Sequence, residues 1–295
     1  MNFNDLLIKN NIDPSHVIML RHRPYEPALN KAFLWIASER HDLFDAYQAT
    51  QPIPLEKAMA RLTGSGYIAS FIGHKPGRAL FVGIYKIESS TPLSYAQFWS
   101  RAEFKELSER FGMAGFQKDK NHPSLLYFNL KPTGIHADWN GKLTIAWTPP
   151  ERSWWRRAHR NDMRIVSILE ESALLKPVPK WREINLSWQE LQALPQQWRV
   201  ALAQWRGVYY IFDKSDGKGY VGSAYGEFNI YGRWLNYAKS GHGGNKLLKN
   251  RDPRNFQFSI VERVSPDMPP DEIISLERTW KKRLHTEAPN GLNEN

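Results

Sequence analysis

The spacing of hydrophobic and polar positions divides the chain into two parts. In the first part, apolar residues recur at helical spacing in three stretches, residues 3–11, 27–39 and 56–62. Five strand-like runs follow them, residues 67–73, 79–87, 125–130, 142–147 and 163–169. Short strands among helices predict an α+β domain over residues 1–175, built around a small curved sheet or barrel.

A change of pattern near two prolines, Pro177 and Pro179, marks a predicted domain boundary. Ser187 and Glu190 have the spacing of a capping box, which predicts a short helix that ends before Pro195. A second helix is predicted over residues 196–205. We therefore expect residues 176–205 to form a helical connector and residues 206–295 to form a second domain.

The second domain opens with a predicted β-hairpin. Gly207–Phe212 has the composition of a strand, Asp216 and Gly217 form a turn signal, and Gly219–Gly222 begins the return strand. Side chains alternate along each strand, so an even-length loop puts odd positions of one strand on the same face as even positions of the other. The hairpin therefore predicts that Tyr209 and Tyr220 project from one face, close enough to act together.

Composition limits the kinds of function that remain. The 295 residues include no cysteine, which excludes disulfides, zinc fingers and thiol catalysis. The sequence has no signal peptide and no apolar stretch of transmembrane length, so we expect no membrane partner and a cytoplasmic location. The net charge is +10, of which the first 204 residues carry +7, and this favours a polyanionic partner such as DNA.

Five segments of the second domain resemble the motifs of the GIY-YIG nuclease family, most closely members of homing-endonuclease type. Gly207–Tyr209 and Tyr220–Gly222 stand for the two motifs that name the family, at the family's spacing. Gly232–Trp234 follows on a predicted helix, Leu276–Arg278 lies on a second helix, and Asn290–Asn293 ends the set. The resemblance covers about residues 205–295. It implies a small antiparallel sheet with flanking helices and an endonuclease that depends on a divalent metal, Mg²⁺ or Mn²⁺.

Glu277 is the candidate metal ligand. Its helix is predicted to begin at Pro269 and Pro270, and Glu277 lies on the apolar stripe of that helix. A carboxylate in that position needs a partner, and a divalent cation would serve. An ion pair with Lys281, four residues later, is the structural alternative.

The resemblance assigns catalytic roles to other residues as well. Arg233 would stabilise the charge on the phosphate, although a solvated helix arginine is the alternative. Tyr209 would act as general base or position the attacking water, with Tyr220 beside it; two aromatic residues of a hairpin core are the alternative. Tyr237 lies one helical turn after Arg233, where many members of the family have histidine and others tyrosine.

Two further residues have a role and an alternative. His242 lies in a glycine-rich segment, as an alternative proton carrier or simply as part of a turn. Asn293 would brace the site from the last residues of the chain, unless the terminus is frayed.

The first domain carries a cluster of arginines around two tryptophans. Arginines that contact phosphate and indoles that stack on bases suit a nucleic-acid surface, but core tryptophans with solvated arginines are the alternative. The candidate residues are Arg152, Trp154, Trp155, Arg156, Arg157 and Arg160, together with Lys218 of the second domain. The strands over residues 66–71 and 81–87 also resemble those of a PUA-like small barrel, a fold class that often reads RNA or modified DNA bases.

These observations favour a metal-dependent endonuclease that hydrolyses DNA phosphodiester bonds, with a target chosen by the first domain, of restriction or mobile-element type. Two alternatives stay open: a nucleic-acid-binding protein with an idle nuclease module, and a nuclease that acts on RNA or in repair incision. Tyr209, Tyr220, Arg233 and Glu277 are all present, which disfavours the idle module.

Overall fold

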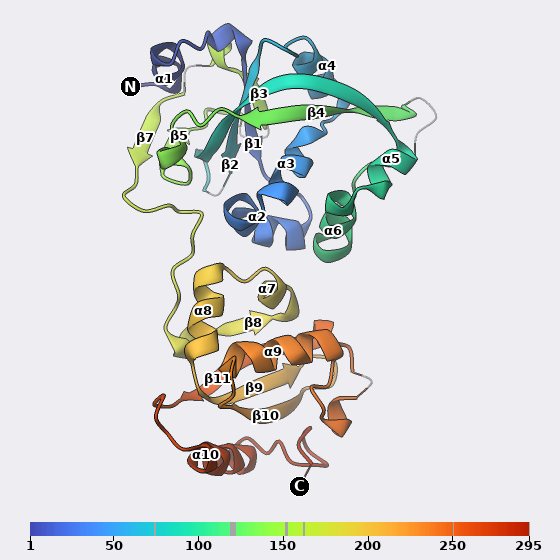
Figure 1. The fold of residues 1–295 in the computed structure, drawn as a ribbon, viewed down its shortest axis with the longest axis vertical. Coiled ribbons are helices and arrows are strands. Elements are labelled where there is room, and N and C mark those ends of the chain that lie inside the picture. The colour runs from blue at the N-terminus through green and yellow to red at the C-terminus, as the bar shows by residue number, and fades with distance from the viewer. Residues whose placement is uncertain (74, 119–121, 151–152, 162, 250, 295) are drawn as a thin grey trace. The chain divides into compact units, whose positions relative to one another are not determined.

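The computed structural model describes residues 1–73, 75–118, 122–150, 153–161, 163–249 and 251–294. The chain forms two compact units, Met1–Leu175 and Lys176–Asn295 (Figure 1). Each unit has its own sheet and its own buried core. Within the described part of the chain, no helix has the length and apolar character that crossing a membrane requires.

One mixed sheet of seven strands forms the centre of the N-terminal unit. Its strand order is β6-β1-β2-β3-β5-β7, and β4 also pairs with β3. The strands are β1 (Val17–His22), β2 (Tyr67–Ile72), β3 (Arg78–Ser94), β4 (Ser124–Pro132), β5 (Leu143–Ala146), β6 (Trp155–Arg157) and β7 (Ile165–Ile168). β1 and β2 run parallel, and every other pairing is antiparallel. The long strand β3 arches along β4 (Figure 1), and this curled sheet confirms the predicted α+β class.

Six α-helices belong to the described part of this unit: α1 (Phe3–Lys9), α2 (Pro27–Glu39), α3 (His41–Ala49), α4 (Ile53–Ala60), α5 (Tyr95–Ser100) and α6 (Ala102–Phe111). α2, α3 and α4 make the crossover that the parallel pair β1 and β2 requires. Local signals explain several of the ends. Pro27 occupies the first turn of α2, Ser94 and Gln97 form a capping box on α5, and α6 ends at Gly112 with φ 74°.

In the N-terminal unit the structure adds five helices and strands that the sequence pattern did not predict: β1, α3, α5, α6 and β6. All six residues of β1 are buried, so the strand lacks the alternation that marks a half-buried strand. α5 has only six residues, too few to give a strong helical period. In α6 the buried residues Phe104, Leu107 and Phe111 do recur at helical spacing, which could have indicated that helix.

A four-stranded antiparallel sheet with the order β10-β9-β11-β8 forms the centre of the C-terminal unit. Its strands are β8 (Asn185–Ser187), β9 (Gly207–Asp213), β10 (Lys218–Ala224) and β11 (Phe256–Arg263). Its α-helices are α7 (Trp188–Gln192), α8 (Gln196–Gln204), α9 (Asn229–Ser240) and α10 (Pro270–Arg283). α9 lies on one side of the sheet and α10 on the other (Figure 1).

Residues 176–205, expected to form a helical connector, belong to the C-terminal unit. The two predicted helices are present as α7 and α8, but β8 precedes them and pairs with β11 through Leu186 and Phe258. Leu186, Leu191 and Leu202 from this segment are buried in the core of the unit. The segment is therefore part of the fold of the C-terminal unit, because its apolar side chains are needed to close that core.

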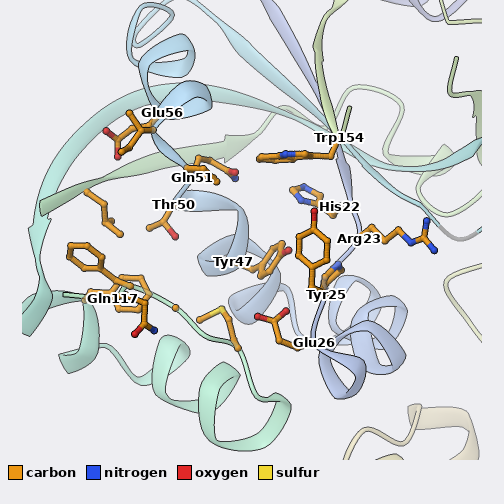
Figure 2. A pocket seen from close by; sticks show the side chains of 18 of the residues that line it. His22, Arg23, Tyr25, Glu26, Tyr47, Thr50, Gln51, Glu56, Gln117 and Trp154 are labelled. Atoms are coloured by element: carbon orange, nitrogen blue, oxygen red, sulfur yellow. The ribbon is translucent and has the colours of Figure 1, made fainter. Parts of the chain in front are cut away.

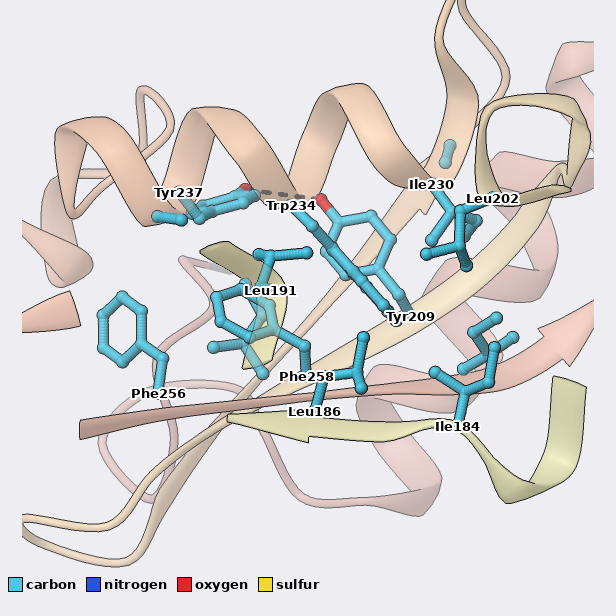
Figure 3. Packing of buried hydrophobic residues seen from close by; sticks show 14 of the residues in the cluster. Ile184, Leu186, Leu191, Leu202, Tyr209, Ile230, Trp234, Tyr237, Phe256 and Phe258 are labelled. Carbon is cyan, nitrogen blue, oxygen red and sulfur yellow. Dashed lines mark hydrogen bonds between the residues drawn. The ribbon is translucent and has the colours of Figure 1, made fainter. Parts of the chain in front are cut away.

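The core of the C-terminal unit lies between the sheet and α9 (Figure 3). Trp234, Tyr209, Tyr237, Phe256 and Phe258 are its large aromatic side chains, and Trp234 packs against Phe258 with ring centroids 5.6 Å apart. The side chain of Tyr209, a candidate catalytic residue, is therefore buried in this core.

Candidate active site

The β9–β10 hairpin puts the two motif tyrosines on one face. Gly222 pairs with Tyr209 and Tyr220 pairs with Ile211, so Tyr209 and Tyr220 are diagonal neighbours with ring centroids 6.4 Å apart. This is the register that the sequence predicted. A Cβ at Gly222 would collide with the Tyr209 hydroxyl, because that ring crosses the glycine. The second motif therefore needs glycine there for the phenol of the first motif to reach across β10.

Tyr210 faces the other side of the sheet. It pairs with Val221 and stacks on Phe212, and both Tyr210 and Phe212 are half-buried. Alternation along β9 groups Tyr210 with Val208 and Phe212, an apolar set that would suit a core, but the large buried cluster of this unit lies on the Tyr209 face. The reason is that α9, with Ile230, Trp234 and Tyr237, packs on that face.

A third tyrosine links the first two. Helix α9 brings Tyr237 over the hairpin, where the Tyr209 hydroxyl donates to the Tyr237 hydroxyl at 3.4 Å (Figure 3). The Tyr237 hydroxyl donates in turn to Tyr220 at 3.0 Å. The three phenols form a continuous chain of hydroxyls that begins in the core and ends at the edge strand β10.

Burial sets the acid–base character of these phenols. It raises the pKa of Tyr209 well above its usual value, Tyr237 and Tyr220 add to the rise, and the charge of Arg233 opposes it. Burial also raises the pKa of Tyr220; Tyr237 and the Glu277 carboxylate add to this, while a hydrogen bond with Asn245 opposes it. In the free protein both phenols are therefore protonated at neutral pH; the Tyr209 hydroxyl donates to Tyr237, and the Tyr220 hydroxyl accepts from it.

Arg233 lies one turn before Tyr237 on α9 and is exposed. Among the described residues, no hydrogen bond or ion pair occupies its guanidinium. Its charge still reaches the Tyr209 hydroxyl, because it lowers the pKa of that group against the effect of burial. The residue therefore offers a free fork of donors close to the phenols, as an anion site requires.

Glu277 comes from α10, on the other side of the sheet from α9. Its carboxylate accepts a hydrogen bond from the Ser223 hydroxyl and forms an ion pair with Lys281 at 2.6 Å. The side chains of Glu277 and Lys281 are only 16% and 20% exposed, so this pair is sheltered. Its carboxylate also raises the pKa of Tyr220, which means that it lies near the end of the hydroxyl chain. The ion pair expected as the structural alternative is thus present.

The end of the chain is docked on β10. Asn293 is 2% exposed, and its side-chain amide accepts from the Val221 N–H at 2.9 Å and donates to the Val221 carbonyl at 2.8 Å. The Leu292 N–H donates to the Gly219 carbonyl at 2.9 Å. The backbone of the edge strand is therefore satisfied by this segment, and Asn293 holds the residue next to Tyr220 in place.

His242 is turned toward its own loop. Its Nδ1 accepts from the Gly244 N–H at 3.0 Å, and no hydrogen bond joins it to a tyrosine among the described residues. The glycine-rich loop itself packs on the site, because a Cβ at Gly243 would lie 2.5 Å from the Tyr237 ring. The structure thus gives His242 a turn-stabilising contact, whereas Asn245 of the same loop reaches Tyr220.

Ser223 and Asn245 were not among the candidate residues. Ser223 has the strand parity that faces α10, so alternation along β10 together with a glutamate on α10 could have indicated it. Asn245 lies in a loop whose path no sequence pattern sets.

In the cluster of arginines and tryptophans, at least one arginine already has hydrogen-bond partners within the N-terminal unit. The guanidinium of Arg156 donates to Asn161 Oδ1 and to the Thr148 carbonyl, both at 2.8 Å, and lies over Trp147. Arg156 is therefore occupied by its own surroundings, which differs from the expected phosphate contact. Arg152 lies outside the described residues.

The remaining members of that set have different positions. Arg157 and Trp155 are half-buried in β6, and Arg160 is exposed. Trp154 lines a cavity of the N-terminal unit. In the other unit, Lys218 donates to the Pro289 carbonyl at 3.0 Å.

The family comparison matches the C-terminal unit. Residues 206–293 match the sequence profile of the GIY-YIG catalytic domain. The catalytic domain of intron endonuclease I-TevI, in a mutant form, is 30% identical to this chain; the match covers 92% of that domain and 30% of this chain, with a TM-score of 0.25. The C-terminal unit belongs to the GIY-YIG family.

A second structure, the catalytic domain of homing endonuclease I-TevI, is 29% identical, and the match covers 98% of it and 30% of this chain, with a TM-score of 0.26. No protein of curated function matches the chain. The GIY-YIG match begins just before Gly207 and ends at Asn293, so it spans every candidate catalytic residue described above.

Proposed function

We propose that the chain is an endonuclease that hydrolyses DNA phosphodiester bonds at the GIY-YIG site, with Mg²⁺ or Mn²⁺ as cofactor. In this proposal the N-terminal unit chooses the target, as in an enzyme of restriction or mobile-element type. One observation carries the proposal: three linked phenols, an arginine with free donors and a sheltered carboxylate converge around β10. Each supplies a part that phosphodiester hydrolysis needs.

Glu277 is the residue that would hold the metal. Among the described residues, no group of three or more His, Cys, Asp or Glu side chains could hold an ion. A single carboxylate is nevertheless a common protein contribution to Mg²⁺ in phosphoryl-transfer sites, where water and phosphate oxygens complete the shell. Lys281 already places a cation on this carboxylate, so a metal ion would replace one positive charge with another. When bound, the ion neutralises charge on the phosphate and acidifies a ligand water.

Arg233 binds a non-bridging phosphate oxygen in this mechanism and stabilises the extra charge of the transition state. Tyr209 orients the attacking water through its hydroxyl. Because burial raises the pKa of Tyr209, the phenol keeps its proton until the cations of the loaded site oppose that effect. Tyr237 and Tyr220 hold the Tyr209 hydroxyl in place and connect it to the Glu277 side of the site.

The substrate class is tested with end-labelled oligonucleotides of one sequence, prepared as duplex DNA, as duplex DNA with modified bases, and as RNA. Each is incubated with the full chain in Mg²⁺, in Mn²⁺ and in EDTA. We expect internal cleavage of DNA that requires metal and stops in EDTA. Cleavage of RNA alone would contradict the proposal, and intact substrates in every mixture would identify the module as idle.

A further inference from the structure

The N-terminal unit contains a cavity of about 1500 Å³ that the GIY-YIG chemistry does not use (Figure 2). It lies at the carboxyl end of β1, where His22 ends the strand and Arg23 and Tyr25 follow. Trp154 lies on the same side, because its carbonyl accepts from the Arg21 N–H at 2.7 Å. The crossover from β1 to β2 leaves the sheet at this point, which is where open sheets with parallel strands form binding clefts.

Aromatic side chains gather at one end of the cavity. Tyr25 is 95% exposed, whereas a tyrosine side chain in a folded protein is usually partly buried. Trp154 and Tyr47 are half-buried, and Figure 2 shows the rings of Tyr25, Trp154 and Tyr47 around His22. An exposed phenol beside a partly exposed indole forms a platform on which a flat ring could stack.

A neutral hydrogen-bonding group lies at the same end. The His22 side chain is 3% exposed, and its Nε2 has no hydrogen-bond partner among the described residues. Burial lowers the pKa of His22 to about 4, against a hydrogen bond with Gln48. The imidazole is therefore uncharged at neutral pH, and its free nitrogen suits a neutral polar ligand better than an ion. Buried nitrogens of this kind normally find a partner.

Charged residues complete the wall and are mainly basic. Arg23, Lys31 and Lys57 are exposed at the cavity. The two carboxylates there are engaged with backbone: Glu26 accepts from the Ala114 N–H at 3.1 Å, and Glu56 accepts from the Leu126 N–H at 2.7 Å. The exposed basic side chains therefore favour a ligand with an anionic backbone, next to the uncharged aromatic end of the cavity.

We propose that this cavity receives one unpaired nucleobase of a DNA strand, stacked on Tyr25 and Trp154, while the cations hold the flanking phosphates. The cavity is larger than the roughly 300–1000 Å³ of small-molecule pockets, which suits a segment of polymer. A flat neutral base matches the aromatic end, and phosphates match the basic residues. The choice of DNA as the polymer rests on the proposed nuclease function of the C-terminal unit.

The test compares two DNA duplexes of the same sequence, one fully paired and one with a single unpaired 2-aminopurine. Fluorescence anisotropy of the full chain in EDTA, where cleavage stops, gives the two affinities. We expect the unpaired duplex to bind about tenfold more tightly, the effect of one base–aromatic stack. We also expect the emission of 2-aminopurine to change on binding.

Matched variants locate that preference. Tyr25→Ala and Trp154→Ala should reduce it to within about twofold of unity. Tyr25→Phe, which keeps the ring, should retain it. Because Tyr25 is exposed, its alanine variant should unfold at the wild-type temperature.

Two outcomes would overturn the inference. One is equal binding of paired and unpaired duplexes by the wild-type chain, and the other is an undiminished preference in Tyr25→Ala and Trp154→Ala. Neither outcome touches the nuclease proposal, because cleavage of DNA in Mg²⁺ is measured separately. Conversely, a chain that prefers the unpaired duplex but cuts no DNA would contradict the nuclease proposal alone.

Discussion

The docked C-terminal segment makes a sharp prediction for Asn293→Ala. The substitution removes both hydrogen bonds to Val221, which is completely buried, and leaves a backbone N–H and a carbonyl unpaired. Each unsatisfied buried group costs about 1–3 kcal/mol. We therefore expect the free energy of unfolding of the C-terminal unit to fall by about 2–6 kcal/mol, which lowers its thermal midpoint by roughly 10–25 °C.

The same change should slow cleavage, because Val221 is the neighbour of Tyr220 on β10. Calorimetry of the full chain and a nicking assay measure the two effects. Asn290→Ala is the matched control, since Asn290 is exposed in the same segment and should change stability by less than about 0.5 kcal/mol. Equal stabilities for Asn293→Ala and Asn290→Ala would refute the docking of the terminus.

Three further predictions concern single side chains. Tyr209→Phe should lower the cleavage rate at least tenfold at nearly unchanged thermal midpoint, whereas Tyr210→Phe should cut normally; the opposite result would shift the hairpin register by one residue. Lys281→Met frees Glu277, so Mn²⁺ measured by electron paramagnetic resonance should bind about fivefold more tightly, the scale of a partly exposed ion pair; unchanged or weaker binding would refute this. The pKa of His22 is about 4 in the folded chain and 6.5 in the unfolded chain. The neutral imidazole therefore contributes about 3 kcal/mol to the free energy of unfolding; this contribution is complete above pH 6.5 and is lost as the pH falls to 4. His22→Phe should flatten that part of the pH–stability curve, and a parallel curve would contradict the burial of a neutral imidazole.

The sequence predicted the shared face of Tyr209 and Tyr220 because a tight hairpin is a local structure. Loop length fixes its register, so Tyr209 and Tyr220 could be assigned to one face without knowledge of the rest of the fold. The helical spacing of Arg233 and Tyr237 is equally local. What joins these pieces is not local: the contact between Ser223 and Glu277 depends on how α10 packs across the sheet.

Long-range pairing explains most of the differences. The three residues of β8 form a strand only because β11 lies beside them. Without that long-range contact, the sequence of residues 176–205 predicts a helical connector. β1 is buried on both faces, so its sequence does not alternate between apolar and polar residues. The parallel pair β1 and β2 at the centre of the N-terminal unit could therefore not be predicted from that pattern. Arg156 looked free because the carbonyl of Thr148 that it binds is not a feature of the sequence pattern.

Nicking of a supercoiled plasmid in Mg²⁺ tests the central claim most directly. The full chain is compared with Glu277→Gln and with Glu272→Gln, a change of an exposed glutamate on the same helix. We expect the wild type and Glu272→Gln to nick at similar rates, and Glu277→Gln to be at least about a hundredfold slower, the usual scale for losing electrostatic stabilisation. Nicking by Glu277→Gln at the wild-type rate would contradict the account of the site.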